Sequence, residues 1–248
     1  TPQTCKMLPA ATGESDIFKV IQLLPGVQSG DEGTNGLNVR GGSSDQNLIM
    51  LDGVALYNPN HLGGFISLFH TEVINNVTLI KAGFPARYGG RLSSVVDVRT
   101  KDGNLRKSVK YAQIGILTSS IYAEGPIKKD TSSYLLSVRR SLFDILLYRP
   151  LLYFDSKAPL IFTYGFYDLN FKFNHRLSPR TKLLLSSYYG DDIMSTKIRT
   201  KDSDATKAGN GIHWGNAMTS VKLNHVFNSK TFENIIVSAS RYRFKNEI

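Results

Sequence analysis

Two stretches rich in glycine and arginine, residues 37–53 and 83–100, are the parts of the sequence best suited to position a charged group. They read LNVRGGSSDQNLIMLDG and GFPARYGGRLSSVVDVRT. Neither has the glycine spacing of a phosphate loop or of a dinucleotide-binding turn. We therefore interpret the glycines as turn and packing residues. An arginine inside a lumen needs a hydrogen-bonding partner or water. A functional contact of Arg40 or Arg91 therefore remains an alternative to a role in turns and packing.

No combination of reactive side chains predicts an enzyme. Ser43, Asp52, His61 and His70 form no recognisable order of nucleophile and base. His61 and His70 lack helical spacing, and no cysteine or carboxylate cluster completes a metal site. The single cysteine, Cys5, cannot form an internal disulfide. The sequence therefore predicts a protein that is not an enzyme, with no cofactor and no metal.

Charge divides the 248 residues into two regions. Residues 1–104 hold eight basic and nine acidic residues, net −1, whereas residues 105–248 hold 22 basic and 11 acidic residues, net +11. A basic excess is typical of proteins that meet nucleic acid, anionic lipid or an anionic ligand. No recognition helix, zinc spacing or aromatic–basic RNA motif accompanies it, so we expect no nucleic-acid partner.

The first region, residues 1–103, predicts a small α+β domain. Ser15 and Asp16 can cap a helix over 16–24, and Pro25-Gly26 would end it. Four candidate strands follow, bounded by Gly, Asn, Asp or Pro, at 37–41, 47–53, 73–83 and 93–100. The third could instead begin with a helical turn at 70–72.

The second region, residues 104–248, predicts long antiparallel strands. In 166–177 the residues Tyr167, Leu169, Phe171 and Phe173 alternate with a polar set, which is Asp168, Asn170, Lys172, Asn174 and Arg176. The sequence contains no run of 18 apolar residues, so it predicts no transmembrane helix. Transmembrane barrel strands alternate in this way, but a soluble β-sandwich with one wet face also does, and remains the alternative.

Short and long connections alternate along this region, as in an outer-membrane barrel. Short turns are predicted at 125–132, 178–181 and 228–231, and long loops at 147–161 and 194–211. A first strand pair is expected within 106–124, reversing near 115–119, which gives about seven strands. An open sheet would leave backbone groups unpaired in lipid, and barrels with a plugged lumen have about 22 strands. We therefore expect an incomplete barrel that belongs to a longer protein.

Three segments carry a resemblance to a known family. Residues 15–69, which include LNVRGG and YNPNHLGGF, and residues 73–103, which include GFPARYGGRLSSVVDV, resemble the plug domain of Bacteroidetes-type TonB-dependent receptors. Residues 124–144, EGPIKKDTSSYLLSVRRSLFD, resemble the first barrel strands of the same receptors. The resemblance implies residues 1–103 as the plug and 104–248 as the N-terminal part of an antiparallel transmembrane β-barrel. It also implies active import across the outer membrane of a Gram-negative bacterium, with gating by TonB and the proton gradient.

The resemblance also implies contacts between plug and barrel. Arg40 matches a plug arginine that pairs with barrel glutamates of later strands. Lys81 stands where arginine is usual, and lysine cannot make the same bidentate fork. Arg87, Tyr88 and Arg91 match the segment that packs toward the barrel wall.

Residues 57–65 resemble an apical plug loop that faces the outer vestibule. Tyr57, Asn58, Asn60 and His61 are the candidate ligand contacts, with an Asn-Pro turn and an exposed histidine as the alternative. Basic residues of the barrel, such as Arg139, Lys172 and Lys222, could focus an anionic ligand, whereas rim residues would bind lipid phosphates; the sequence does not separate the two.

The partners that the resemblance implies are TonB, through a segment outside this chain, outer-membrane lipid and an unknown small ligand. A surface lipoprotein that lids the barrel is common among related receptors. Two other functions remain open at this stage. One is a receptor that senses a ligand and signals, and the other is a soluble β-rich binding protein.

Overall fold

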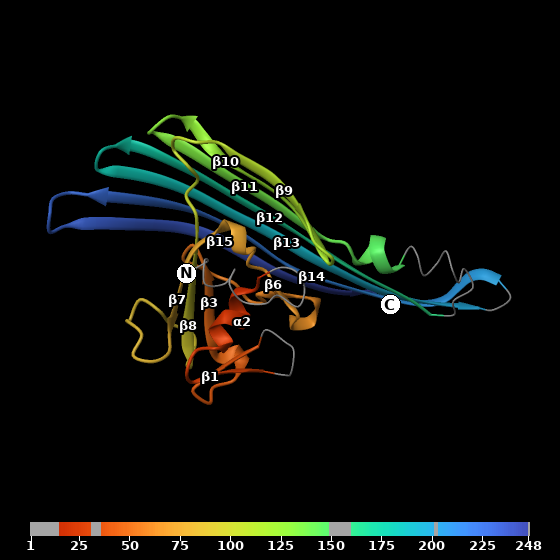
Figure 1. Cartoon of the computed structure of the whole chain (residues 1–248). Helices are drawn as coiled ribbons and strands as arrows, with labels where there is room; N and C mark the ends of the chain where they lie inside the picture. Colours follow the sequence, from red (N-terminus) through yellow and green to blue (C-terminus); the bar gives the residue numbers. More distant parts are fainter. Residues whose placement is uncertain (1–14, 31–35, 149–159, 201–202, 248) are drawn as a thin grey trace.

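The computed structural model describes residues 15–30, 36–148, 160–200 and 203–247. Cys5 and most of the predicted loop 147–161 lie outside these residues. A small N-terminal domain lies against one face of a long, curved sheet that the rest of the chain forms (Figure 1).

The N-terminal domain begins with helix α2 (Ile17–Gln22). The Asp16 side chain caps it by accepting a hydrogen bond from the backbone N–H of Phe18 at 2.8 Å, as the sequence predicted. Ile17, Phe18 and Ile21 are buried. The helix ends earlier than predicted, and Leu24, expected on its apolar stripe, is 41 % exposed.

Short strands form the rest of the domain. A four-stranded sheet has the order β4-β3-β8-β7, with β3 (Asn47–Leu51) parallel to β8 (Ser94–Thr100), and with β4 (Val54–Ala55) and β7 (Ile74–Ile80) antiparallel to their neighbours. Two ribbons pair β1 (Val27–Ser29) with β2 (Leu37–Val39) and β5 (Asn60–His61) with β6 (Ile66–Ser67). Single 3₁₀ turns lie at η1 (Ser44–Gln46), η2 (Leu62–Gly64) and η3 (Thr71–Val73). All four predicted strands are present with shorter bounds, and a helical turn precedes the third.

A seven-stranded antiparallel sheet follows in chain order, and its strands are β9 (Val109–Ile114), β10 (Thr118–Lys128), β11 (Ser132–Ser141), β12 (Leu160–Ser178), β13 (Thr181–Thr200), β14 (Ser203–Val226) and β15 (Phe232–Glu247). A helical turn, η4 (Asp144–Tyr148), follows β11. The predicted seven strands are confirmed, including a first pair that reverses between residues 114 and 118.

The prediction of a long loop at 194–211 is wrong. Strands β13 and β14 stay paired up to Thr200 and Ser203, so this segment is a long hairpin. Ladder pairing satisfies the backbone N–H and C=O groups whatever the polarity of the side chains, and a polar composition therefore does not end a strand by itself. The turn predicted at 125–132 is also shorter, because β10 continues to Lys128.

The alternation predicted for β12 is confirmed, and it shows which face of the sheet meets the domain. Four of the five residues of the polar set are buried, namely Asp168 at 1 %, Asn170 at 5 %, Lys172 at 6 % and Asn174 at 2 % exposure. The fifth, Arg176, lies near the turn and is exposed. Tyr167 and Leu169 on the other face are each 39 % exposed. The polar face of the sheet therefore covers the N-terminal domain, and the apolar face points away from it.

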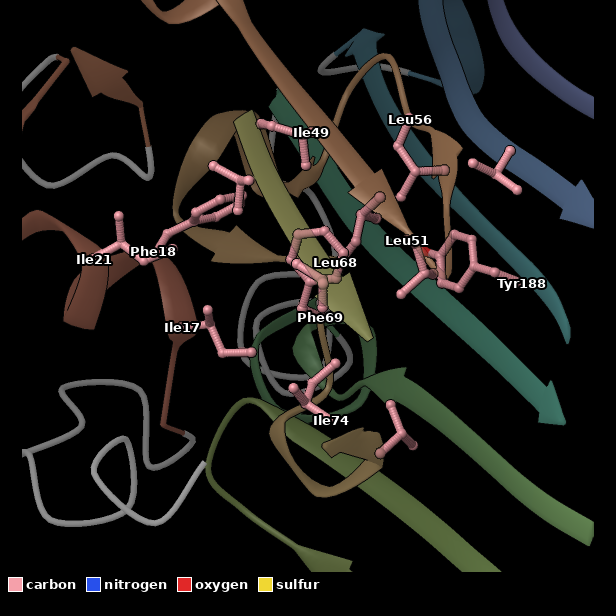
Figure 2. Close-up of a cluster of buried hydrophobic side chains, with 14 of the residues drawn as sticks. Ile17, Phe18, Ile21, Ile49, Leu51, Leu56, Leu68, Phe69, Ile74 and Tyr188 are labelled. Atoms are coloured by element: carbon pink, nitrogen blue, oxygen red, sulfur yellow. The ribbon is translucent and has the colours of Figure 1, made fainter. Parts of the chain in front are cut away.

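One hydrophobic core joins the domain and the sheet (Figure 2). Ile17, Phe18 and Ile21 of α2 and Leu51 of β3 belong to it, and Tyr188 of β13 closes it from the sheet side. The other sheet residues of this core are Tyr122, Leu135 and Met218. No helix in the described parts of the chain is long and apolar enough to cross a membrane.

Candidate functional site between the N-terminal domain and the sheet

His61 is the centre of a buried polar cluster that joins the domain to the sheet. It lies on β5, just after the Asn58-Pro59 turn, and is 0 % exposed. Its Nδ1 lies 2.7 Å from Asp192 Oδ2, and its Nε2 lies 2.9 Å from Asp168 Oδ1. Ionised carboxylates only accept hydrogen bonds, so both ring nitrogens donate and the ring is an imidazolium. The ring also stacks on Phe166 at 4.1 Å between centroids.

The electrostatic surroundings of His61 favour this charged form. Burial alone would lower the pKa of His61, but the attraction and hydrogen bonds of Asp168, and then of Asp192, outweigh burial. The pKa of His61 is therefore raised above its ordinary value.

The two carboxylates have further partners on both sides of the interface. Arg139 Nε lies 2.7 Å from Asp168 Oδ2, and Arg139 Nη2 also donates to the carbonyl of Ser67 at 2.8 Å. The Tyr188 hydroxyl donates to Asp168 Oδ1 at 2.5 Å, and the Tyr164 hydroxyl donates to Asp192. We call this the His61 cluster, and its charged members are His61, Arg139, Asp168 and Asp192. Two cations face two carboxylates, so the buried charge is balanced.

A second polar cluster lies where the domain passes into the sheet. Lys172 Nζ lies 3.1 Å from Asp52 Oδ1 and 3.1 Å from Asp102 Oδ1, and it donates to the carbonyl of Thr100 at 3.0 Å. Lys182 Nζ lies 2.5 Å from Asp102 Oδ2. Burial alone would raise the pKa of Asp102, but Lys172 and Lys182 outweigh it and lower that pKa. We call this the Lys172 cluster; it ties the end of β3 and the linker to β12 and β13.

A cavity of about 700 Å³ adjoins the Lys172 cluster. Both parts of the chain line it, with Arg87, Tyr88 and Arg99 from the domain and Lys182 and Lys222 from the sheet. Its volume falls in the range of small-molecule sites.

The structure places the predicted plug contacts as follows. Arg40 is exposed, in a left-handed backbone conformation with φ 50°, and its N–H donates to the carbonyl of Gly26. Lys81 donates from Nζ to the carbonyl of Pro25. Arg87 donates to the hydroxyl of Tyr88 at 2.8 Å, and both line the cavity. Arg91 is exposed and donates to the carbonyl of Gly90. Pairing of these residues with a barrel wall stays a prediction.

The four predicted ligand contacts divide into two kinds. Tyr57 is 66 % exposed and lies near Tyr242, 6.5 Å between ring centroids. The carbonyl of Asn58 accepts from Asn216 Nδ2 at 2.7 Å, and Asn60 is half-buried. The alternative of an exposed histidine is wrong, because His61 is buried between the domain and the sheet. Its contact with a ligand stays a prediction. In this conformation only Tyr57 offers a largely free side chain.

Burial also changes the interpretation of the basic sheet residues. Arg139 and Lys172 are engaged with carboxylates, so they hold the domain in place instead of facing a ligand. Lys222 is half-buried and lines the cavity. His70, considered above for catalysis, is 2 % exposed and hydrogen-bonds Ser137 Oγ at 2.9 Å. Within the described residues, no group of three or more His, Cys, Asp or Glu side chains could hold a metal ion.

Sequence reasoning missed Asp192 and the partnership of Asp168 with His61. Asp168 was placed on the polar face of a strand, which is the one signal that could have marked it as facing the lumen. No local pattern links it to His61, 107 residues earlier.

Comparisons with known proteins show what the chain resembles. Residues 8–96 match the family described as the TonB-dependent Receptor Plug Domain. No curated protein matches the sequence.

Three solved structures share the fold at low identity. The siderophore receptor PirA from Acinetobacter baumannii is 15% identical over 98% of this chain and 44% of its own, with a TM-score of 0.52. The outer membrane transporter YddB from Escherichia coli is 12% identical over 98% and 47%, with a TM-score of 0.55. The copper transporter OprC is 11% identical over 94% and 45%, with a TM-score of 0.58. The chain thus spans less than half the length of each of these structures.

Proposed function

We propose that this chain, which carries the plug domain of a TonB-dependent receptor followed by strands of the same fold, takes part in active import of a scarce ligand across a bacterial outer membrane. Residues 1–103 act as the plug, and the seven-stranded sheet is one part of the barrel wall. The likeness to the three solved structures supports the fold; location, import and gating by TonB are our inference.

The observation that carries this proposal is the polar interface between plug and wall. The His61 and Lys172 clusters join the two parts through ion pairs and hydrogen bonds to the buried polar residues Asp168 and Lys172 of β12. Apolar contacts of Tyr164 and Phe166 lie beside them on the same face. Charged groups can exchange a protein partner for water when an interface opens, whereas an apolar core cannot. Such an interface suits a plug that must rest securely and yet be moved.

The ligand should first meet the plug at its apical loop. Tyr57 is exposed there, beside Tyr242 of the wall, and an aromatic pair of this kind can bind an apolar or cationic group. Among the solved structures that share this fold, PirA is a siderophore receptor and OprC is a copper transporter. These two classes are therefore the first ligands to test.

Uptake by the full-length receptor tests the proposal. Cells that express the complete gene should accumulate a labelled ferric siderophore or copper, and a proton ionophore or deletion of TonB should abolish accumulation but leave surface binding intact. Accumulation that ignores the proton gradient would overturn the proposal. A purified receptor that stays monodisperse without detergent would contradict the membrane location.

A further inference from the structure

The face of the sheet that points away from the plug carries a groove outside the interface between plug and wall. It measures about 340 Å³. Its rim residues share one face of the sheet, because the register pairs Leu169 with Tyr189, Tyr189 with Ala217, and Ala217 with Arg241. Small side chains leave the groove open, namely Ser187, Ala217, Thr219 and Ala239. We call it the outer groove.

The outer groove continues into a basic notch of about 110 Å³ lined by Arg241 and Arg243. Arg243 Nη2 lies 2.7 Å from Asp191 Oδ2, and Asp191 is only 4 % exposed. Arg241 is exposed and pairs with no carboxylate among the residues that the structure describes. Within residues 203–247 and the strands paired with them, the notch thus holds two arginines and one carboxylate, and Asp191 fixes the position of Arg243.

Gly215 makes this arrangement possible. It lies between Asp191 and Arg243 in the register of the three strands. A Cβ at Gly215 would lie 2.5 Å from Asp191 Oδ1, so a side chain there would push the carboxylate aside. The glycine lets Asp191 fold against the sheet and hold the Arg243 guanidinium beside the groove.

The position of the groove along the strands matches the polarity of a membrane interface. Tyr167 and Tyr189 stack at 5.9 Å between centroids beside the notch, as aromatic residues do where a barrel leaves the bilayer. The apolar side chains of β12 on this face, Leu169, Phe171 and Phe173, lie between these tyrosines and the short turn after Ser178. The groove thus extends toward the apolar band, and its arginines lie at the interface on the side of the long hairpins.

We propose that the outer groove binds a phosphorylated lipid of the outer leaflet, with an acyl chain along the small residues and a phosphate at Arg241 and Arg243. Arginine guanidinium groups bind phosphate oxygens through bidentate, charge-assisted hydrogen bonds. The combination of an apolar groove and a cationic end fits an amphiphile better than a free anion. This inference rests on the proposed outer-membrane location but is independent of import.

Binding of lipid A by the purified full-length receptor tests the inference. Native mass spectrometry would compare adducts of lipid A with two phosphates, lipid A after dephosphorylation, and lipid A in the presence of inorganic phosphate. We expect the wild-type receptor to retain the phosphorylated lipid and R241Q/R243Q to retain it roughly tenfold less, since each basic residue near a lipid surface contributes. A217W, which keeps both arginines but fills the groove, should also lower retention.

The matched control is R140Q. Arg140 pairs in register with Tyr167, at the same level of the sheet, but lies outside the groove and is held by Asp144 at 2.5 Å. An equal loss in R140Q would show attraction to rim charge in general, and equal retention of the dephosphorylated lipid would show binding without phosphate recognition; either result overturns the proposal. A receptor that binds no lipid but dimerises in detergent, and becomes monomeric in R241Q/R243Q, would assign the face to a second copy instead. None of these readouts requires uptake, so import can fail while this proposal holds.

Discussion

His61 combines complete burial with hydrogen bonds to two carboxylates, and its charge follows from that geometry. A neutral imidazole would offer one donor and would turn a lone pair toward one of the aspartates. Asp168 and Asp192 can therefore both accept a hydrogen bond from His61 only when its ring carries the second proton. The two carboxylates in turn stabilise the charge of the protonated ring. Buried ion pairs add little net stability against an apolar alternative, but removing one partner is costly because the other charge stays buried.

Replacement of His61 by glutamine should loosen the apical loop of the plug. His61→Gln keeps an amide NH₂ donor but loses the positive charge, so Arg139 is left as the only cation of the cluster. We expect a cost of about 3 kcal/mol. Hydrogen exchange of residues 57–65 in the full-length receptor measures this loosening, and exchange should be faster in His61→Gln than in the wild type. The control is His213→Gln, since His213 is partly exposed on the opposite face of β14 and should leave exchange unchanged.

Plug attachment should also weaken at alkaline pH. The pKa of His61 is raised in the folded protein, so its contribution is fully present below the ordinary histidine pKa of about 6.5 and is lost as the pH rises through the higher folded value. Arg139 keeps its charge throughout this range, because an arginine side chain is effectively always protonated. Exchange of residues 57–65 should accelerate above neutral pH beyond the intrinsic chemical increase in the wild type but not in His61→Gln. An identical pH profile in both proteins would contradict the role of the His61 proton.

Residue-scale prediction from the sequence was partly successful, for a physical reason. The period of two along β12 placed Asp168 and Lys172 on the polar face correctly, because side-chain alternation is a local property of a strand. The partners of these residues, His61 and Asp52, lie far away in the chain, and ion pairing between distant segments leaves no local pattern. Asp52, His61 and Arg139 lie within segments that resemble the receptor family, but no pattern within those segments marks them as buried partners of the other part of the chain.

At the scale of elements, turn chemistry and alternation located most strands, but polarity misplaced one connection. The segment 194–211 was expected to be a loop because it is charged, yet β13 and β14 continue through it as a paired hairpin. In helix α2, local chemistry predicted the start correctly, because Asp16 caps it, but the C-terminal end was predicted too late in the sequence. A strand ends where its backbone pairing with a neighbouring strand ends. The polarity of single residues does not show where that neighbouring strand lies.

The linker between plug and wall contains a glycine with no room for a side chain. Gly103 has φ 80°, and a Cβ there would lie 2.5 Å from the carbonyl oxygen of Tyr134 on β11. Gly103→Ala should therefore shift the linker and disturb the neighbouring Asp102, which pairs with Lys172 and Lys182. We expect a loss of about 1–3 kcal/mol. Resistance of the linker to limited proteolysis would measure it.

Gly89 provides the matched control for Gly103. A Cβ at Gly89 would meet nothing within 4 Å, and its backbone is not in the left-handed region. Gly89→Ala should therefore be cut no faster than the wild type. Equal sensitivity of the two variants would show that the linker tolerates a side chain and that close approach to Tyr134 is not limiting.

On the scale of the whole molecule, plug and wall share two hydrophobic clusters and two polar clusters among the described residues. Tyr188 and Met218 of the sheet complete the apolar core of the plug, the His61 cluster holds the apical loop, and the Lys172 cluster holds the linker. The plug is thus attached at two separated places, with a cavity of about 700 Å³ beside the second. Import past such a plug requires that at least one attachment opens.

A reversible cross-link across the interface tests whether it must open. Asn216 Nδ2 on β14 lies 2.7 Å from the carbonyl of Asn58 in the apical loop, so the two backbones are near each other. With Cys5→Ser to remove the native thiol, Asn58→Cys and Asn216→Cys would be joined by a short reducible bis-thiol reagent. The joined receptor should bind ligand at the cell surface but import none, and reduction should restore import. The control joins Thr163→Cys to Ser195→Cys, two positions paired within the sheet on the face that points away from the plug. Import by the plug-joined receptor at the rate of this control would show that the apical contact stays closed during transport, and the opening would then have to occur at the Lys172 cluster.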